Sequence, residues 1–190
     1  MGRARRVIDP DCIYHVMCRG SNRGRIAWDD VDYQSLADGL SAVAIRHGFE
    51  VFAWCVMPNH HHVVLRVPNG GFSVGFQVLN QGHSIRTNRR YTRSAHLFSN
   101  RPHVLRIASQ AHLIHAILYV LRNPVEAGLC AHARLWPYSS YRATIGSTRR
   151  PSWLLAETVL ELVGGAEELE RLVHRRPSPV SGTAFDATSG

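Results

Sequence analysis

The sequence contains no lysine, and all 22 of its basic residues are arginines. It also lacks any acidic residue between Glu50 and Glu126, a stretch that holds eight arginines and eight histidines. The formal net charge of the whole chain is +8. An arginine run is often only a solvated basic face, but the absence of acids over so long a stretch favours a polyanionic partner such as a nucleic acid.

Long hydrophobic runs and paired cysteines are missing as well. The longest apolar run, residues 112–121, is too short to span a bilayer. The basic N-terminus continues into Asp9, Pro10 and Asp11 instead of an apolar secretory core. We therefore expect a soluble intracellular protein with no membrane partner. The four cysteines form no Cys-x-x-Cys pair, which favours reduced core thiols over a disulfide framework or a zinc knuckle.

A chain of 190 residues with 45% hydrophobic content suffices for one core of ordinary size. We expect a main domain over residues 1–145, followed by a linker and a small helical extension over residues 146–176. Residues 177–190 are too poor in apolar side chains to fold and are expected to be a disordered tail.

The spacing of apolar residues predicts a strand, a helix, two strands, a helix and a strand, in that order. The strands are expected at residues 12–18, 49–57, 61–67 and 103–108, and the helices at residues 30–47 and 72–91. A further helix over residues 110–122 is expected to stop near Asn123, because Pro124 disfavours helical geometry in the residue before it. This order predicts the α+β class: a ferredoxin-like or RRM-like antiparallel sheet with helices on one face and the other face open for a ligand.

Three successive histidines open the third predicted strand. Because side chains alternate along a strand, His60 and His62 share one face and His61 takes the other. Two imidazoles at this spacing can reach one metal ion. A bare His-x-His is a weak signal, since such histidines also pack at sheet ends. A histidine-triad hydrolase would need a third alternating histidine, but that position is Val64.

The helix expected from residue 110 carries a polar stripe opposite its apolar face. His115, Tyr119 and Asn123 follow one another at intervals of four and so lie along one side. Taken alone, Tyr119 is also explained as an amphipathic ring at the edge of the core, and Asn123 as the residue that ends the helix.

Together with other short motifs of the sequence, the histidine motif and the polar stripe resemble those of the REP-associated tyrosine transposases, a branch of the single-tyrosine HUH transposases. The resemblance extends from about residue 5 to residue 145. The shared motifs are, in order, Tyr14-His15-Val16 with Arg19-Gly20, residues 53–62, Asn88-Arg89-Arg90, Leu97-Phe98, Tyr119 with residues 123–129, and residues 136–140. Each motif alone is weak evidence for the family, whereas their combination in this order is specific to it.

The resemblance implies a metal-dependent transposase that nicks and joins single-stranded DNA. In such an enzyme His60 and His62 bind Mg²⁺ or Mn²⁺, Asn123 supplies a further oxygen ligand, and Tyr119 attacks a phosphate to form a 5′-phosphotyrosine. The implied partner is single-stranded or hairpin DNA of palindromic repeats, in a bacterial-type cytoplasm at the nucleoid, and a homodimer is left open. The arginines expected to hold DNA are Arg86, Arg89, Arg90, Arg93, Arg101 and Arg122.

The sequence departs from the motifs of the family at two places, and two alternative functions stay open. The middle residue of the histidine motif is usually bulky and apolar in relatives, and here it is His61. The residues after Leu97-Phe98 also lack the glutamine-arginine-aromatic motif that is common at this place in relatives. A non-catalytic RRM-like nucleic-acid binder would share the open sheet and the basic stretch, although no aromatic-rich RNP1-type strand is present. A water-using metal hydrolase would tolerate phenylalanine at position 119.

Overall fold

The computed structural model of the chain describes residues 8–99 and 101–175. The tail expected over residues 177–190 lies outside the described residues. None of the helices in the described ranges has the length and apolar character needed to cross a membrane.

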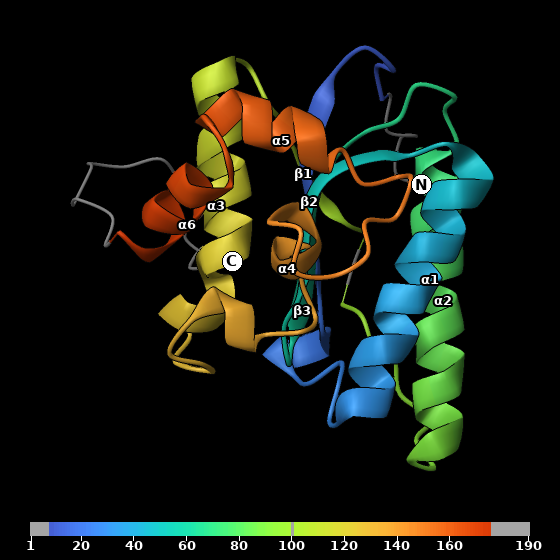
Figure 1. Cartoon of the computed structure of the whole chain (residues 1–190). Coiled ribbons are helices and arrows are strands. Elements are labelled where there is room, and N and C mark those ends of the chain that lie inside the picture. Colours follow the sequence, from blue (N-terminus) through green and yellow to red (C-terminus); the bar gives the residue numbers. More distant parts are fainter. Residues whose placement is uncertain (1–7, 100, 176–190) are drawn as a thin grey trace.

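A four-stranded antiparallel sheet lies at the centre of the molecule (Figure 1). Its strands are β1 (Ile13–Arg19), β2 (Glu50–Val56), β3 (His60–Arg66) and β4 (His103–Arg106), in the spatial order β2-β3-β1-β4. The helices α1 (Asp30–His47) and α2 (Phe72–Arg90) follow β1 and β3 in the chain and pack against each other. The α+β class, the antiparallel sheet and the predicted order of elements are confirmed.

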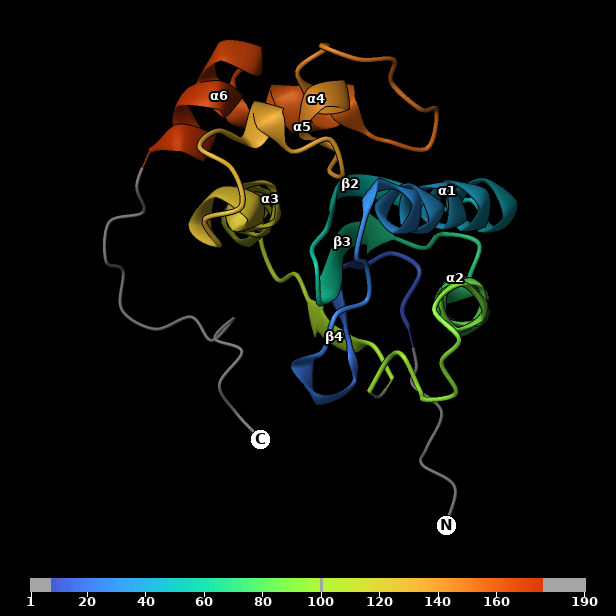
Figure 2. The same cartoon turned by 90° about the horizontal axis from the view of Figure 1, so that it is seen from below.

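The third long helix, α3 (Gln110–Glu126), covers the other face of the sheet. Seen from below, α3 lies on one side of the strands and both α1 and α2 lie on the other (Figure 2). The expectation that one face stays open is therefore wrong. The apolar side of α3 requires a partner, and it buries Leu113, Ile117 and Leu121 in a core shared with Ala53 and Val64 of the sheet.

Pro124 lies inside α3, so the expected stop near Asn123 is wrong by about one turn. Ser109 caps the start of the helix, since its side chain accepts a hydrogen bond from the His112 N–H. Near the end, Pro124 lacks the N–H that would bond the Val120 carbonyl. The Asn123 side chain folds back on the helix, and its Nδ2 donates to the Tyr119 carbonyl at 2.9 Å. The Ala127 N–H then donates to the Asn123 carbonyl, and the helix continues to Glu126.

The C-terminal residues fold against the same core. Short 3-10 turns lie at Ser21–Arg23 and Ala133–Leu135. Three short helices follow the second turn: α4 (Tyr141–Thr144), α5 (Ala156–Val163) and α6 (Ala166–His174). Leu169 of α6 is fully buried beside α3 residues. The segment before α5 also extends the edge of the sheet, because the Val51 N–H donates to the Trp153 carbonyl at 3.0 Å. These helices are thus a cover for the core.

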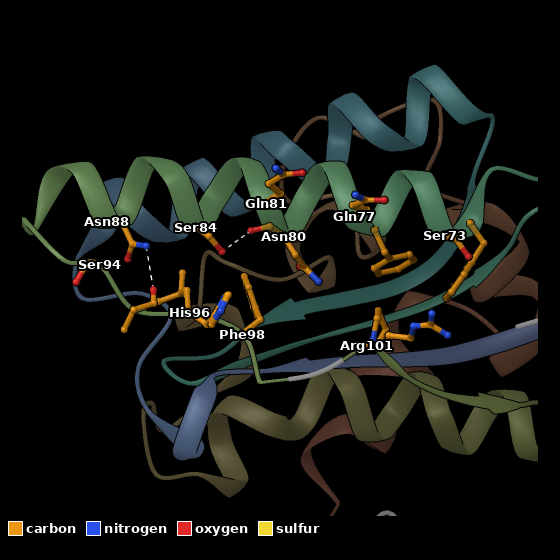
Figure 3. A pocket seen from close by; sticks show the side chains of 15 residues that line it. Ser73, Gln77, Asn80, Gln81, Ser84, Asn88, Ser94, His96, Phe98 and Arg101 are labelled. Atoms are coloured by element: carbon orange, nitrogen blue, oxygen red, sulfur yellow. Dashed lines mark hydrogen bonds between the residues drawn. The ribbon is translucent and has the colours of Figure 1, made fainter. Parts of the chain in front are cut away.

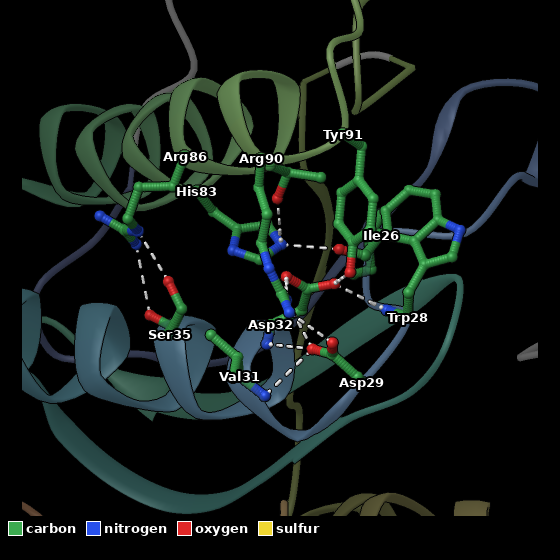
Figure 4. A network of polar contacts seen from close by, with 11 residues as sticks. Ile26, Trp28, Asp29, Val31, Asp32, Ser35, His83, Arg86, Arg90 and Tyr91 are labelled. Carbon is green, nitrogen blue, oxygen red and sulfur yellow. Dashed lines mark hydrogen bonds and ion pairs between the residues drawn. The ribbon is translucent and has the colours of Figure 1, made fainter.

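A polar network ties the start of α1 to the end of α2 (Figure 4). Its centre is Asp32, a buried carboxylate that accepts hydrogen bonds from the Trp28 N–H at 2.9 Å and the Tyr91 hydroxyl at 2.8 Å. Arg90 forms ion pairs with Asp32 at 2.7 Å and with Asp29 at 2.5 Å. Because Asp32 is 3% exposed, its partners would be left unsatisfied if the carboxylate were removed.

We expect Asp32→Ala to lower the free energy of unfolding by about 3 kcal/mol, since it removes a buried, fully bonded charge. Urea unfolding monitored by circular dichroism measures the loss. Asp38→Ala is the matched control: Asp38 is an exposed α1 carboxylate that accepts a hydrogen bond from the Gln34 amide, and its loss should stay within about 0.5 kcal/mol. Equal effects of the two substitutions would contradict the role given to the network.

Candidate active site

The pairing of β1 with β3 places a group of histidines on the face that α3 covers. His15 pairs with Val64, Met17 with His62 and Arg19 with His60. Residues paired across antiparallel strands share a face, so His15, His60 and His62 all point to the α3 side. His61 points to the opposite side, as the alternation in the sequence predicts.

Tyr119 and Asn123 reach the same place from α3. The ring of Tyr119 lies edge-on to the ring of His62, with 5.6 Å between their centroids, and 5.9 Å from the ring of His15. The rings of His60 and His62 are 4.7 Å apart. The Asn123 side chain hydrogen-bonds His60, a contact that raises the pKa of His60. The structure thus brings the four expected residues of the catalytic centre together.

Hydrogen bonds orient both metal-ligand candidates. His60 Nδ1 lies 2.6 Å from Asn59 Oδ1, which can accept only from a protonated ring nitrogen and so leaves Nε2 of His60 with a lone pair. His62 Nδ1 lies 2.8 Å from His15 Nε2. The other nitrogen of His62, Nε2, is buried without a hydrogen-bond partner among the described residues.

Burial keeps these imidazoles neutral. Desolvation, followed by the charge of Arg19, lowers the pKa of His60 to about 4 despite the opposing contact with Asn123. Desolvation, followed by the neighbouring His60, holds the pKa of His62 well below its ordinary value. The pKa of His15 is lowered to about 4, mainly by burial. A neutral imidazole with a free lone pair is the form that binds a metal ion.

The residues present fit a divalent metal ion. The unpartnered Nε2 of His62 and the Nε2 of His60 supply two nitrogen ligands. Asn123 Nδ2 is bonded to the Tyr119 carbonyl, so Oδ1 is the atom that faces His60, and it can supply an oxygen ligand in place of that contact. Within residues 8–99 and 101–175 no group of three or more histidines, cysteines or carboxylates could form a metal site. Two imidazoles and one amide therefore leave coordination positions for water or a substrate oxygen, as open catalytic sites do.

The six expected DNA-binding arginines do not gather around Tyr119. Helix α2 lies across the sheet from α3 (Figure 2). On α2, Arg86 bonds Ser35 and Arg90 bonds Asp29 and Asp32, while Arg89 is exposed. Beyond α2, the guanidinium of Arg93 lies 5.0 Å from the Trp28 ring, and Arg101 lines a cavity on the α2 side. Arg122 donates to the carbonyls of Leu172 and Val173 in α6.

Sequence reasoning missed Arg19 and His15 as parts of the site. Both belong to the first motif shared with the REP-associated transposases. However, only the register of β1 on β3 places Arg19 beside His60 and His15 against His62. His115, in contrast, shares the stripe of Tyr119 but is exposed. The signal that could have identified His15 is its alternation with Tyr14 and Val16, once β1 is known to lie next to β3.

Comparisons with known proteins show what the chain as a whole is similar to. The family model described as "Transposase IS200 like" matches residues 9–120. Among solved structures, a REP-associated tyrosine transposase bound to a REP hairpin is similar with a TM-score of 0.63 and 21% identity, covering 76% of this chain and 86% of that one. A putative transposase from Deinococcus radiodurans R1 has a TM-score of 0.43 and 21% identity, covering 60% and 91%. No curated protein matches the chain.

At 21% identity the structural likeness to the hairpin-bound transposase shows the fold. The family model, in contrast, spans more than half of the chain and includes β1, β3 and Tyr119. The chain belongs to the IS200-like transposase family.

Proposed function

We propose that the protein is a metal-dependent endonuclease and strand transferase for single-stranded DNA, with Tyr119 as nucleophile and His60, His62 and Asn123 as metal ligands. The observation that carries the proposal is the placement of the Tyr119 ring 5.6 Å from His62, whose Nε2 is buried without a partner among the described residues. A water-using hydrolase would have no need for a phenol at this place, and a binding module would have no need for the unpartnered imidazole nitrogen.

The chemistry follows from the side chains at the site. The Tyr119 hydroxyl loses its proton and its oxygen attacks the phosphorus of a phosphodiester, so that a 5′-phosphotyrosine bond forms while the bond to O3′ breaks. The O3′ leaves as a free hydroxyl once it gains a proton. A bound divalent ion supplies positive charge that offsets the charge on the phosphate oxygens. Arg19, beside His60, adds a second positive charge.

The phosphotyrosine bond keeps the energy of the broken phosphodiester. A 3′-hydroxyl from another strand can therefore attack the phosphorus and release Tyr119 without ATP. Attack by a side chain held between α3 and the sheet requires an accessible, unpaired phosphate, which favours single-stranded or hairpin-flanking DNA. The REP hairpin bound by the similar transposase supports hairpin repeats as the substrate of this chain too.

We expect the protein, incubated with Mn²⁺ and labelled single-stranded hairpin oligonucleotides, to give a DNA-linked band on a denaturing gel. Tyr119→Phe should reduce the band to background, because phenylalanine has no oxygen to attack the phosphate. Tyr138→Phe, which alters a tyrosine packed against Tyr33 of α1, should leave it unchanged. Strand cleavage that survives in Tyr119→Phe would instead identify a water-using nuclease.

We also assign His15 the role of a positioning residue. If His62 binds the ion through Nε2, its Nδ1 carries the proton and donates to His15 Nε2 at 2.8 Å, which fixes the tautomer and the ring. We expect His15→Ala to weaken Mn²⁺ binding by about 10- to 100-fold, and His15→Gln, which keeps an acceptor, to recover most of the affinity. Titration of free Mn²⁺ by electron paramagnetic resonance measures both, and equal affinities for wild type and His15→Ala would refute the role.

A further inference from the structure

The middle histidine of the motif forms a polar contact on the face of the sheet opposite the metal-ligand candidates. His61 is fully buried, and its Nε2 donates to Asn80 Oδ1 of α2 at 3.0 Å. Its ring lies parallel to the ring of Phe76 and edge-on to the ring of Phe98. An apolar side chain at this position would pack against the two phenyl rings but could not bond Asn80.

Asn80 connects α2 to both strands that carry the site. Its Oδ1 accepts from His61 of β3, and its Nδ2 donates to Cys18 Sγ of β1 at 3.3 Å. Cys18 and His61 are paired directly across the two strands. One amide therefore contacts both members of a cross-strand pair, and this pair lies between the pairs that contain His60 and His62.

These contacts fix one arrangement of the sheet on α2. A buried donor or acceptor costs free energy when it has no partner, so His61 and Asn80 are satisfied in one relative position, whereas apolar side chains can pack in several. His60 and His62 are the neighbours of His61 on the same strand, and their side chains leave the backbone on the other face. A displacement of β3 on α2 would move both imidazoles, and metal ligands tolerate little displacement.

Asn80 also lies on the wall of a cavity of about 860 Å³ between α2 and the segment that leads into β4 (Figure 3). The exposed amides of Gln77 and Gln81 line the same cavity. Within α2, the Asn80 carbonyl accepts from Ser84 Oγ at 2.7 Å. The space beside Asn80 allows its side chain to be replaced without a clash in the core, so the contact with His61 can be removed from either end.

We propose that His61 is a positioning residue: through its bond to Asn80 it holds β3 on α2, so that His60 and His62 keep the spacing at which they bind one metal ion. This inference rests on the proposed function, which names those two histidines as ligands. His61 does not itself touch the ion, because its side chain points to the α2 face. Its effect therefore falls on the affinity of the protein for the metal.

Titration of free Mn²⁺ by electron paramagnetic resonance tests the proposal in variants that circular dichroism shows to be folded. His61→Leu leaves Asn80 Oδ1 without its donor, and Asn80→Leu leaves His61 Nε2 without its acceptor. We expect each to weaken Mn²⁺ binding by about tenfold, the low end of what the loss of an orienting residue costs a metal site. His61→Gln, whose amide can still donate to Asn80, should recover most of the affinity. Asn80→Leu carries the test if His61→Leu does not fold.

The double variant His61→Leu, Asn80→Leu separates one shared contact from two independent ones. Because both polar partners are removed together, it should bind Mn²⁺ no more weakly than either single variant. Gln77→Ala, which alters an exposed α2 amide on the same cavity, is the matched control and should bind Mn²⁺ as the wild type does. Losses that multiply in the double variant would contradict the link through Asn80.

Urea unfolding of the same variants separates positioning from packing. Wild-type Mn²⁺ affinity in both single variants, whatever their loss of stability, would overturn the proposal and leave the proposed function intact. Failure of the wild type to bind Mn²⁺ would overturn the proposed metal ligands and this inference with them. The expected losses of affinity, without a DNA-linked band in the wild type, would contradict the Tyr119 chemistry alone.

Discussion

The antiparallel register of β1 on β3 is the constraint on which the rest of the site depends. It sets Met17 opposite His62 and Arg19 opposite His60, and so fixes the face on which the two metal-ligand candidates lie. A shift by one residue would turn His60 and His62 toward α2 and put His61 in their place. The hydrogen bond between His15 and His62 adds a polar contact at the centre of this face.

The two faces of the sheet then take different tasks. The α3 face carries the histidines, Arg19, Asn123 and Tyr119 among buried apolar side chains, which suits chemistry that needs neutral imidazoles and little water. The α2 face carries the amide-lined cavity and the network around Asp32. Because His61 separates His60 from His62 along one strand, three consecutive residues set both the metal-ligand pair on one face and the contacts with Asn80 and Phe76 on the other.

Much of the fold could be predicted from periodicity. The bounds of α1 match the expectation over residues 30–47, because Asp29 and Gly48 are strong local end signals. The family was also predicted from the short sequence motifs, and the match of the family model to residues 9–120 confirms it. Periodicity shows that α3 buries one side, but it does not reveal which face of the sheet receives that side. The continuation past Pro124 is visible only in the folded backbone, where the Ala127 N–H donates to the Asn123 carbonyl.

The arginines were the least predictable part of the candidate site. Arginine side chains are long, and their partners come from distant elements, so that Arg90 meets Asp29 and Asp32 of α1, and Arg122 meets the carbonyl groups at the end of α6. Charge along the sequence predicts a polyanionic partner without saying which guanidinium groups are already bound within the protein. The same reasoning missed His15, since its partner His62 lies 47 residues away in the chain.

The most direct test of the account is to locate the covalent bond to DNA. Cleavage by trypsin after Arg106 and Arg122 releases residues 107–122, a peptide whose one tyrosine is Tyr119. After reaction with a hairpin oligonucleotide and Mn²⁺, followed by nuclease trimming, mass spectrometry should find a nucleotide phosphate on Tyr119 of this peptide. A nucleotide on a different tyrosine, or strand cleavage with no modified peptide, would contradict the assignment of Tyr119 as the nucleophile.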